Sequence, residues 1–152
     1  MADRASASIT IGGGIAREQF ETLTRLIGDE DLRIEWDGDP FAPDMLEAGE
    51  PLSLCAHEVS WGNFNALEQY CYDQRIPYHR WSGACPGSFG AERIVFDGKH
   101  GPFNYDADED DRIVLTAETI AQLGSMRAIR AYLKPTTRGV PALVIAGQSR
   151  PS

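Results

Sequence analysis

The sequence predicts an α+β fold around a ferredoxin-like split βαβ core, in which two helices cover one face of an antiparallel sheet. Two observations lead to this prediction. Apolar residues recur at helical spacing in the segments Phe20–Leu26 and Phe64–Tyr70, and a tryptophan follows each phenylalanine after 16 and 17 residues. Short segments of alternating polarity flank both helices, as a sheet with one covered face requires. The expected order through residue 82 is therefore strand-helix-strand, twice.

The four core strands are predicted from this alternation. In Ser6–Ile11, serine and threonine alternate with isoleucine until three glycines end the strand. The segment 38–51 is rich in proline and acid, so we expect an exposed connection there, with a short helical turn at Asp44–Ala48. The other three strands are expected at Leu32–Trp36, Leu52–His57 and Pro77–Trp81.

A C-terminal αβ extension is predicted to lengthen the sheet or to cover part of its open face. Thr116 and Ser125 precede two short helical segments as N-caps, and Pro135 ends the second helix. Strands are expected at Ile94–Phe96, Arg112–Leu115 and Leu143–Ile145, with Gly98–Asp111 as the connection between the first two. Residues 1–152 thus form one domain, with a core at 1–82, an extension at 83–147 and a frayed tail at 148–152.

The composition is that of a globular protein without a membrane segment, at 42% hydrophobic and 24% charged residues. No apolar run approaches the roughly 20 residues that a bilayer span needs. The three cysteines Cys55, Cys71 and Cys85 are odd in number and too few for a disulfide framework. We therefore expect reduced thiols and a cytoplasmic location.

Charge is distributed very unevenly along the chain. Residues 1–111 contain 22 acidic against 8 basic residues, whereas residues 112–152 contain 1 against 6, which together give the net charge of −9. Nine carboxylates lie between Asp29 and Glu50, and five lie between Asp106 and Asp111. Such a field attracts basic partners and repels nucleic acid phosphates.

These two acidic blocks are the candidate partner-binding site. As closely spaced carboxylates they can take the place of nucleic acid phosphates, which repeat about every 1.7 Å along a duplex. A solvated loop is the alternative, and a calcium loop lacks the required glycine and distal glutamate. The candidate partner-binding residues are Asp106, Asp108, Glu109, Asp110, Asp111, Asp37, Asp39, Asp44 and Glu47.

Cysteine and histidine residues suggest a weaker alternative. Cys55 and His57 would share one face of a strand, and Cys85 could meet His79 or His100 as a thiol and its base. Zinc sites normally show two close ligand pairs, and the chain has one. The sequence therefore predicts no catalytic residue, no metal site and no cofactor.

The predicted function is that of a non-enzymatic acidic module that occludes a basic, nucleic-acid-binding protein. In size and charge alone the chain resembles phage- or plasmid-borne anti-restriction and anti-CRISPR inhibitors. A small enzyme or ligand-binding domain that uses Cys and His residues on the open sheet face is the alternative, and a structural subunit is a third class. Neither direct nucleic acid binding nor membrane binding is expected. The basic stripe Arg127, Arg130 and Lys134 would allow a homodimer.

Overall fold

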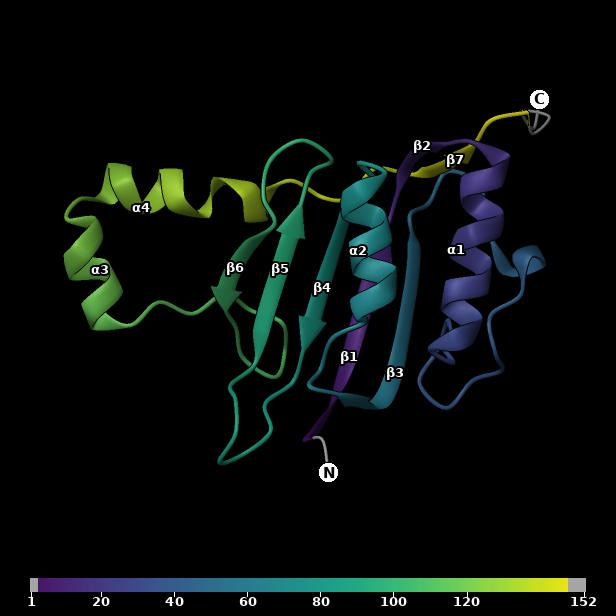
Figure 1. The fold of residues 1–152 in the computed structure, drawn as a ribbon. Helices are drawn as coiled ribbons and strands as arrows, with labels where there is room; N and C mark the ends of the chain where they lie inside the picture. Colours follow the sequence, from purple (N-terminus) through teal and green to yellow (C-terminus); the bar gives the residue numbers. More distant parts are fainter. Residues whose placement is uncertain (1–2, 148–152) are drawn as a thin grey trace.

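A five-stranded antiparallel sheet forms the centre of the protein in a computed structural model that describes residues 3–147 (Figure 1). The strand order is β3-β1-β4-β5-β6. The predicted α+β class is confirmed, and the tail expected at 148–152 lies outside the described residues. The strands of this sheet are β1 (Arg4–Ile11), β3 (Leu52–Ser60), β4 (Tyr78–Ser82), β5 (Glu92–Phe96) and β6 (Phe103–Asp106).

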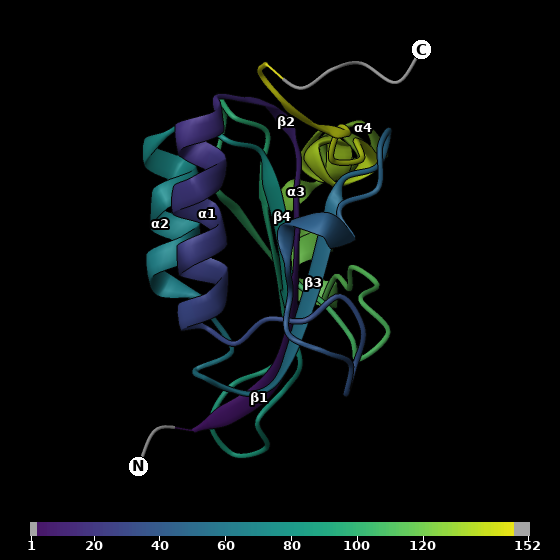
Figure 2. The same ribbon diagram turned by 90° about the vertical axis from the view of Figure 1, so that its right-hand side faces the viewer.

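Helices α1 (Arg17–Asp29) and α2 (Asn65–Asp73) cover one face of the sheet (Figure 2). Their buried residues lie at helical spacing, and they pack on the isoleucines and leucines of β1 and β3. The opposite face carries the polar side chains of the strands with alternating polarity. Loops and the C-terminal segment lie on that side. The helix residues buried in the core are Phe20, Leu23, Ile27, Leu67 and Cys71.

A buried ion cluster joins α2 to β4 and β5. The side chain of Arg80 is 4% exposed and donates from Nε to Glu68 at 2.8 Å and from Nη2 to Glu92 at 3.0 Å. Its Nη1 donates to the carbonyl oxygen of Gly62 and to Ser82 Oγ, both at 2.9 Å. A buried guanidinium needs all of these partners, because an unpaired buried charge is strongly destabilising.

The strand predicted at Leu32–Trp36 does not form. A single antiparallel bridge joins Arg33 to Cys55 of β3, and Arg33 also pairs with Pro40 as the chain folds back on itself. The turn is closed by a hydrogen bond from Gly38 N to the Glu35 carbonyl oxygen at 3.0 Å. The alternating polarity of this segment led to a wrong prediction, because Leu32 is the only one of its three apolar side chains that is buried, at 1% exposed.

The strand predicted at Arg112–Leu115 is also wrong. The strand that pairs with β5 is β6, which lies inside the segment expected to be a connection. Residues 107–113 form a tight turn closed by an isolated bridge between Ala107 and Ile113. The Asp108 carboxylate organises this turn by accepting from the backbone N–H groups of Asp110 and Arg112, which prevents Arg112 from extending a strand.

The rest of the extension follows the prediction. Helices α3 (Ala117–Leu123) and α4 (Met126–Leu133) are capped by Thr116 and Ser125, whose hydroxyls each accept a backbone N–H three residues on. Strand β7 (Leu143–Ile145) pairs in parallel with the short β2 (Gly13–Ile15), so the chain returns to its N-terminal half. Within residues 3–147, no helix has the length and apolar character needed to cross a membrane.

Candidate functional site: an acidic groove along β3

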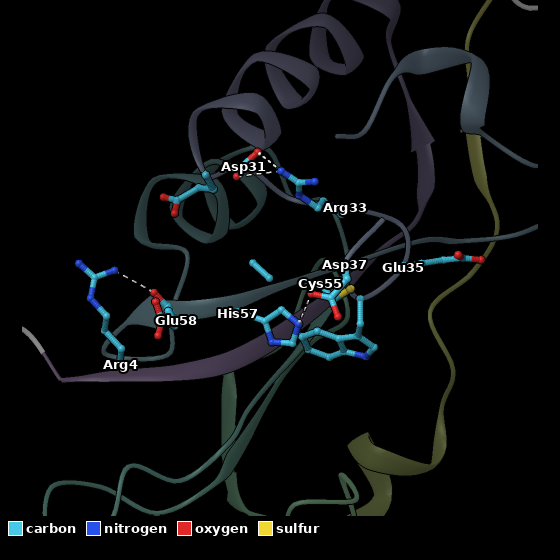
Figure 3. Close-up of a pocket in the computed structure, with 11 residues that line it drawn as sticks. Arg4, Asp31, Arg33, Glu35, Asp37, Cys55, His57 and Glu58 are labelled. Carbon is cyan, nitrogen blue, oxygen red and sulfur yellow. Dashed lines mark hydrogen bonds and ion pairs between the residues drawn. The ribbon is translucent and has the colours of Figure 1, made fainter. Parts of the chain in front are cut away.

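The outer edge of β3 borders two adjoining cavities of about 570 and 390 Å³, which together we call the acidic groove. Figure 3 shows the larger of the two. Its walls are β3 and the segment that leaves α1, which places the first acidic block against the sheet edge. The groove is lined by six carboxylates against two arginines. The carboxylates belong to Asp29, Glu30, Asp31, Glu35, Asp37 and Glu58, and the arginines are Arg4 and Arg33.

Several residues around the groove have backbone dihedral angles that are rare for their residue types. Of the six non-glycine residues with positive φ among residues 3–147, four line the groove: Asp31 (53°), Asp37 (63°), Glu58 (53°) and Trp61 (56°). Aspartate tolerates this region, but glutamate and tryptophan adopt it rarely. Such conformations cluster at functional sites, because the surrounding structure must hold them in place.

Both arginines of the groove are already engaged within the chain. Arg4 Nη1 donates to the Glu58 carbonyl oxygen at 3.0 Å, and the Arg33 guanidinium contacts the Gly38 carbonyl oxygen and lies 3.3 Å from the Asp31 carboxylate. Glu30, Glu35 and Glu58 have no side-chain hydrogen bond or ion pair within the described residues. The groove therefore presents unneutralised negative charge to solvent.

His57 lies within the groove and contacts three neighbours. Its Nε2 is 3.2 Å from an Asp37 carboxylate oxygen (Figure 3). Its Nδ1 is 3.4 Å from Ser6 Oγ, and the centroid of its ring is 4.8 Å from that of the Trp36 ring. The Trp36 side chain is 45% exposed, and Trp61 at the other end of the groove is 52% exposed. Two accessible indoles thus accompany the carboxylates.

The pKa values of two groove residues reflect the many acidic side chains around them. Partial burial and the charges of Asp29 and Glu68 raise the pKa of Glu30 above its ordinary value. Burial, Asp37 and Glu35 likewise raise the pKa of the Cys55 thiol. A bound cation would relieve this repulsion, whereas a thiolate at Cys55 is disfavoured.

The acidic run Asp106–Asp111 is arranged differently, because internal contacts engage four of its five carboxylates. Asp108 accepts from Arg112 Nε at 2.7 Å in addition to its two backbone donors, and these hydrogen bonds lower its pKa. Glu109 accepts from Ala84 N at 2.8 Å, Asp111 accepts from Arg93 Nε at 2.8 Å, and Asp110 lies 3.4 Å from Arg112. The run is a folded loop with partners for most of its charges.

The first acidic block starts at the end of α1 and passes the edge of β3 to the side of the sheet opposite the helices, where the acidic run also lies (Figure 2). The first block borders β3, while the acidic run is anchored over β4 and β5, where Trp81 Nε1 donates to the Asp108 carbonyl oxygen at 2.9 Å. No hydrogen bond or ion pair between residues 3–147 joins the two blocks. They therefore flank the open face from two positions.

The predicted site residues divide accordingly. Asp37 lines the groove, whereas Asp39, Asp44 and Glu47 follow it on the exposed segment toward β3. Five of the six carboxylates that line the groove were not among the predicted site residues: Asp29, Glu30, Asp31, Glu35 and Glu58. The first four belong to the same acid-rich segment and could have been included, but no sequence signal places Glu58 beside them. Glu58 lies at a bulge in β3, where the register with β1 shifts between Ala5 and Ala7, and there it lines the same cavities as the acidic block.

The cysteines and histidines do not converge on one centre. Cys55, His57 and His79 share the open face, but Cys85 follows the end of β4 whereas His79 stands near its start. Burial raises the pKa of Cys71 to about 12, so this thiol is a packing residue. Among residues 3–147, no three His, Cys, Asp or Glu side chains gather as a metal ion would need.

Comparisons with protein-family models, with curated proteins and with solved structures find no match to this chain.

Proposed function

We propose that the acidic groove binds an arginine- or lysine-rich surface of a partner protein, and that the chain thereby blocks nucleic acid from that partner. The observation that carries this proposal is the group of six carboxylates along the edge of β3, of which Glu30, Glu35 and Glu58 have no side-chain partner within residues 3–147. Inhibition by charge mimicry, as in anti-restriction and anti-CRISPR proteins, is the form of activity that we propose.

The chemistry of the groove suits a cationic side chain. A guanidinium can pair with a carboxylate through two hydrogen bonds and stack on an aromatic face. Glu35 and Glu58 supply free carboxylates, and Trp36 and Trp61 supply exposed indoles. Tryptophan and arginine are also the residues that most often dominate protein interfaces.

The binding test compares two variants that each lose four charges without changing side-chain size. The groove variant carries Asp31→Asn, Glu35→Gln, Asp37→Asn and Glu58→Gln, and the control carries Glu18→Gln, Glu21→Gln, Asp73→Asn and Glu118→Gln. Asparagine preserves the positive φ at both aspartate positions. With fluorescent octa-arginine as the probe, we expect the groove variant to bind roughly 10- to 100-fold more weakly than the wild type.

The control variant should bind octa-arginine nearly as well as the wild type, because its mutated residues lie away from the groove. Raised salt should weaken wild-type binding, since exposed charges are screened over about 10 Å at 0.1 M ionic strength. Equal losses in both variants would show that net charge alone attracts the peptide, and the proposal would fail.

Inhibition itself is tested on a partner recovered from the native cell with the wild-type chain as bait. A recovered protein that binds nucleic acid should lose its gel shift when the wild-type chain is added. The groove variant should not compete, and the matched control should. A gel shift that persists with the wild-type chain would contradict the inhibitor role.

We also propose that the core is a ferredoxin-like split βαβ arrangement with a reduced second strand. Support comes from β1, which lies between β3 and β4 and is antiparallel to both, and from Arg33, which bridges β3 where that second strand would pair. A cytoplasmic location is proposed from the cysteines, all three of which are free thiols.

A second candidate function is a small hydrolase, which the alignment of Ser6, His57 and Asp37 favours. The histidine contacts both the hydroxyl and the carboxylate, as a base between a nucleophile and an orienting acid does. A fluorophosphonate probe that labels the wild type at Ser6 and fails to label His57→Ala would support it. Absence of labelling at Ser6 would reject it and leave the binding proposal untouched.

A further inference from the structure

A separate cavity of about 400 Å³ lies on the open side of the sheet at the start of β4 and the end of β5. One wall is the turn between β5 and β6, and another is the strap at 135–141 that leads from α4 to β7. The strap packs closely against Gly12, the residue that follows β1, where a Cβ would lie 1.8 Å from the Pro141 carbonyl oxygen. The cavity is therefore preformed, as most small-molecule sites are.

Its lining is basic in a protein of net charge −9. Lys99 and Arg138 both line it, and neither forms an ion pair within the part of the chain that the structure describes. The one carboxylate of the lining belongs to Asp97, which accepts from the backbone N–H groups of Lys99 and His100 and lies 3.0 Å from the His100 ring. These contacts lower the pKa of Asp97 to about 2, so it stays ionised, and the lining sets two cations, Lys99 and Arg138, against this one carboxylate.

The rest of the lining includes the imidazole of His79 and a buried apolar surface. Neither ring nitrogen of His79 forms a hydrogen bond within residues 3–147, although burial and the charge of Arg93 lower its pKa and keep the ring neutral at neutral pH. Val95, which pairs with His79 across the sheet, is buried beneath it at 2% exposed. An arginine and a lysine suit an oxyanion, a neutral imidazole can donate one N–H, and the apolar surface suits hydrocarbon.

We propose that this cavity binds a small organic anion, with a carboxylate or phosphate held by Lys99 and Arg138 and an apolar body against Val95. The site is independent of the acidic groove and of the function proposed for it. It adds a ligand to a chain whose other features point to a macromolecular partner.

Calorimetry at constant ionic strength tests the site with four probes: phenyl phosphate, benzoate, inorganic phosphate and neutral benzyl alcohol. We expect phenyl phosphate or benzoate to bind more tightly than inorganic phosphate, and benzyl alcohol to bind weakest. A preference for phenyl phosphate assigns a phosphate head group, and a preference for benzoate assigns a carboxylate.

The Lys99→Gln/Arg138→Gln variant should bind the preferred probe at least about tenfold more weakly. The matched control Arg127→Gln/Arg130→Gln removes the same charge from α4 and should bind normally. The ring resonances of His79 should shift with the preferred probe in the wild type. Absence of binding at millimolar concentrations, or equal weakening in both variants, would overturn the proposal.

Discussion

The two acidic blocks of this protein use the same residue types in opposite ways. In the first block, seven of the nine carboxylates between Asp29 and Glu50 form no hydrogen bond or ion pair within residues 3–147, and the exceptions are Asp31 and Asp37. In the acidic run, four of five carboxylates have partners in the chain, and Asp106 is the exception. The denser run of acids in the sequence thus offers the smaller share of free charge.

The density of acidic residues along the sequence therefore does not measure how many carboxylates are free to bind a partner. Closely spaced acids in a tight turn can bind their own backbone N–H groups, which an extended segment cannot do. The pKa directions follow this difference, since hydrogen bonds lower the pKa of Asp108 while burial and neighbouring acids raise that of Glu30. Four predictions test this difference between the two blocks.

The largest expected contrast is the one between the groove variant and a variant in which the acidic run is neutralised to match it. The changes are Asp108→Asn, Glu109→Gln, Asp110→Asn and Asp111→Asn, which remove four charges. We expect octa-arginine binding to weaken only about two- to threefold, against roughly 10- to 100-fold for the groove variant. Fluorescence anisotropy measures both, and a larger loss from the acidic run would reverse the roles assigned to the two blocks.

Removal of the arginine that anchors the acidic run should destabilise the fold. Arg93→Met retains the apolar stem but loses the contacts of Arg93 with the carboxylate and carbonyl oxygens of Asp111. We expect urea denaturation to show a loss of roughly 1–3 kcal/mol in unfolding free energy. Arg127→Met, on the exposed face of α4, is the control and should change it by less than about 0.5 kcal/mol. An unchanged midpoint for Arg93→Met would show that the anchor contributes nothing.

A smaller loss is expected when Glu109 is shortened. Glu109→Ala removes the acceptor of the Ala84 N–H and should cost about 0.5–1.5 kcal/mol of unfolding free energy. Glu109→Gln keeps an oxygen in place and should remain close to the wild type. If the glutamine variant is as destabilised as the alanine variant, charge rather than the hydrogen bond holds the loop.

The smallest effect is a difference in the pH dependence of stability. The folded pKa of Asp108 is below its ordinary 3.8, so its contribution is present above that value and lost as pH falls through the folded pKa. Wild type should therefore exceed Asp108→Asn in stability at neutral pH, with the gap closing below pH 3.8. Neutralisation in the groove should act with the opposite sign.

Glu30 provides that opposite case, because its folded pKa lies above its ordinary 4.5 and ionisation therefore opposes folding. Glu30→Gln should be more stable than the wild type at neutral pH, and this gain should vanish as pH falls below 4.5. Urea midpoints measured between neutral pH and pH 3 resolve both trends. If Asp108→Asn and Glu30→Gln changed stability relative to the wild type in the same direction at neutral pH, the difference described between the two blocks would be contradicted.

Much of the architecture follows from local patterns in the sequence. The spacing of Phe20 with Leu23 fixes a helix face, the alternation in β1 fixes a half-covered strand, and Thr116 and Ser125 fix where α3 and α4 begin. These features depend on period and capping, which act within a few residues. The uneven charge and the free cysteines were equally readable from the chain.

Tertiary structure decided which of these residues act together. Leu32–Trp36 has the alternation of a strand, yet it forms one bridge because Ile34 and Trp36 have nothing to cover them and are 37% and 45% exposed. Glu58 lines the same cavities as the first acidic block at a bulge in β3, and Asp111 meets Arg93 because β5 lies beneath the acidic run. Local propensity cannot specify such contacts, since they depend on how distant segments pack. The sequence by itself determined the charge, and packing determined where that charge stays free.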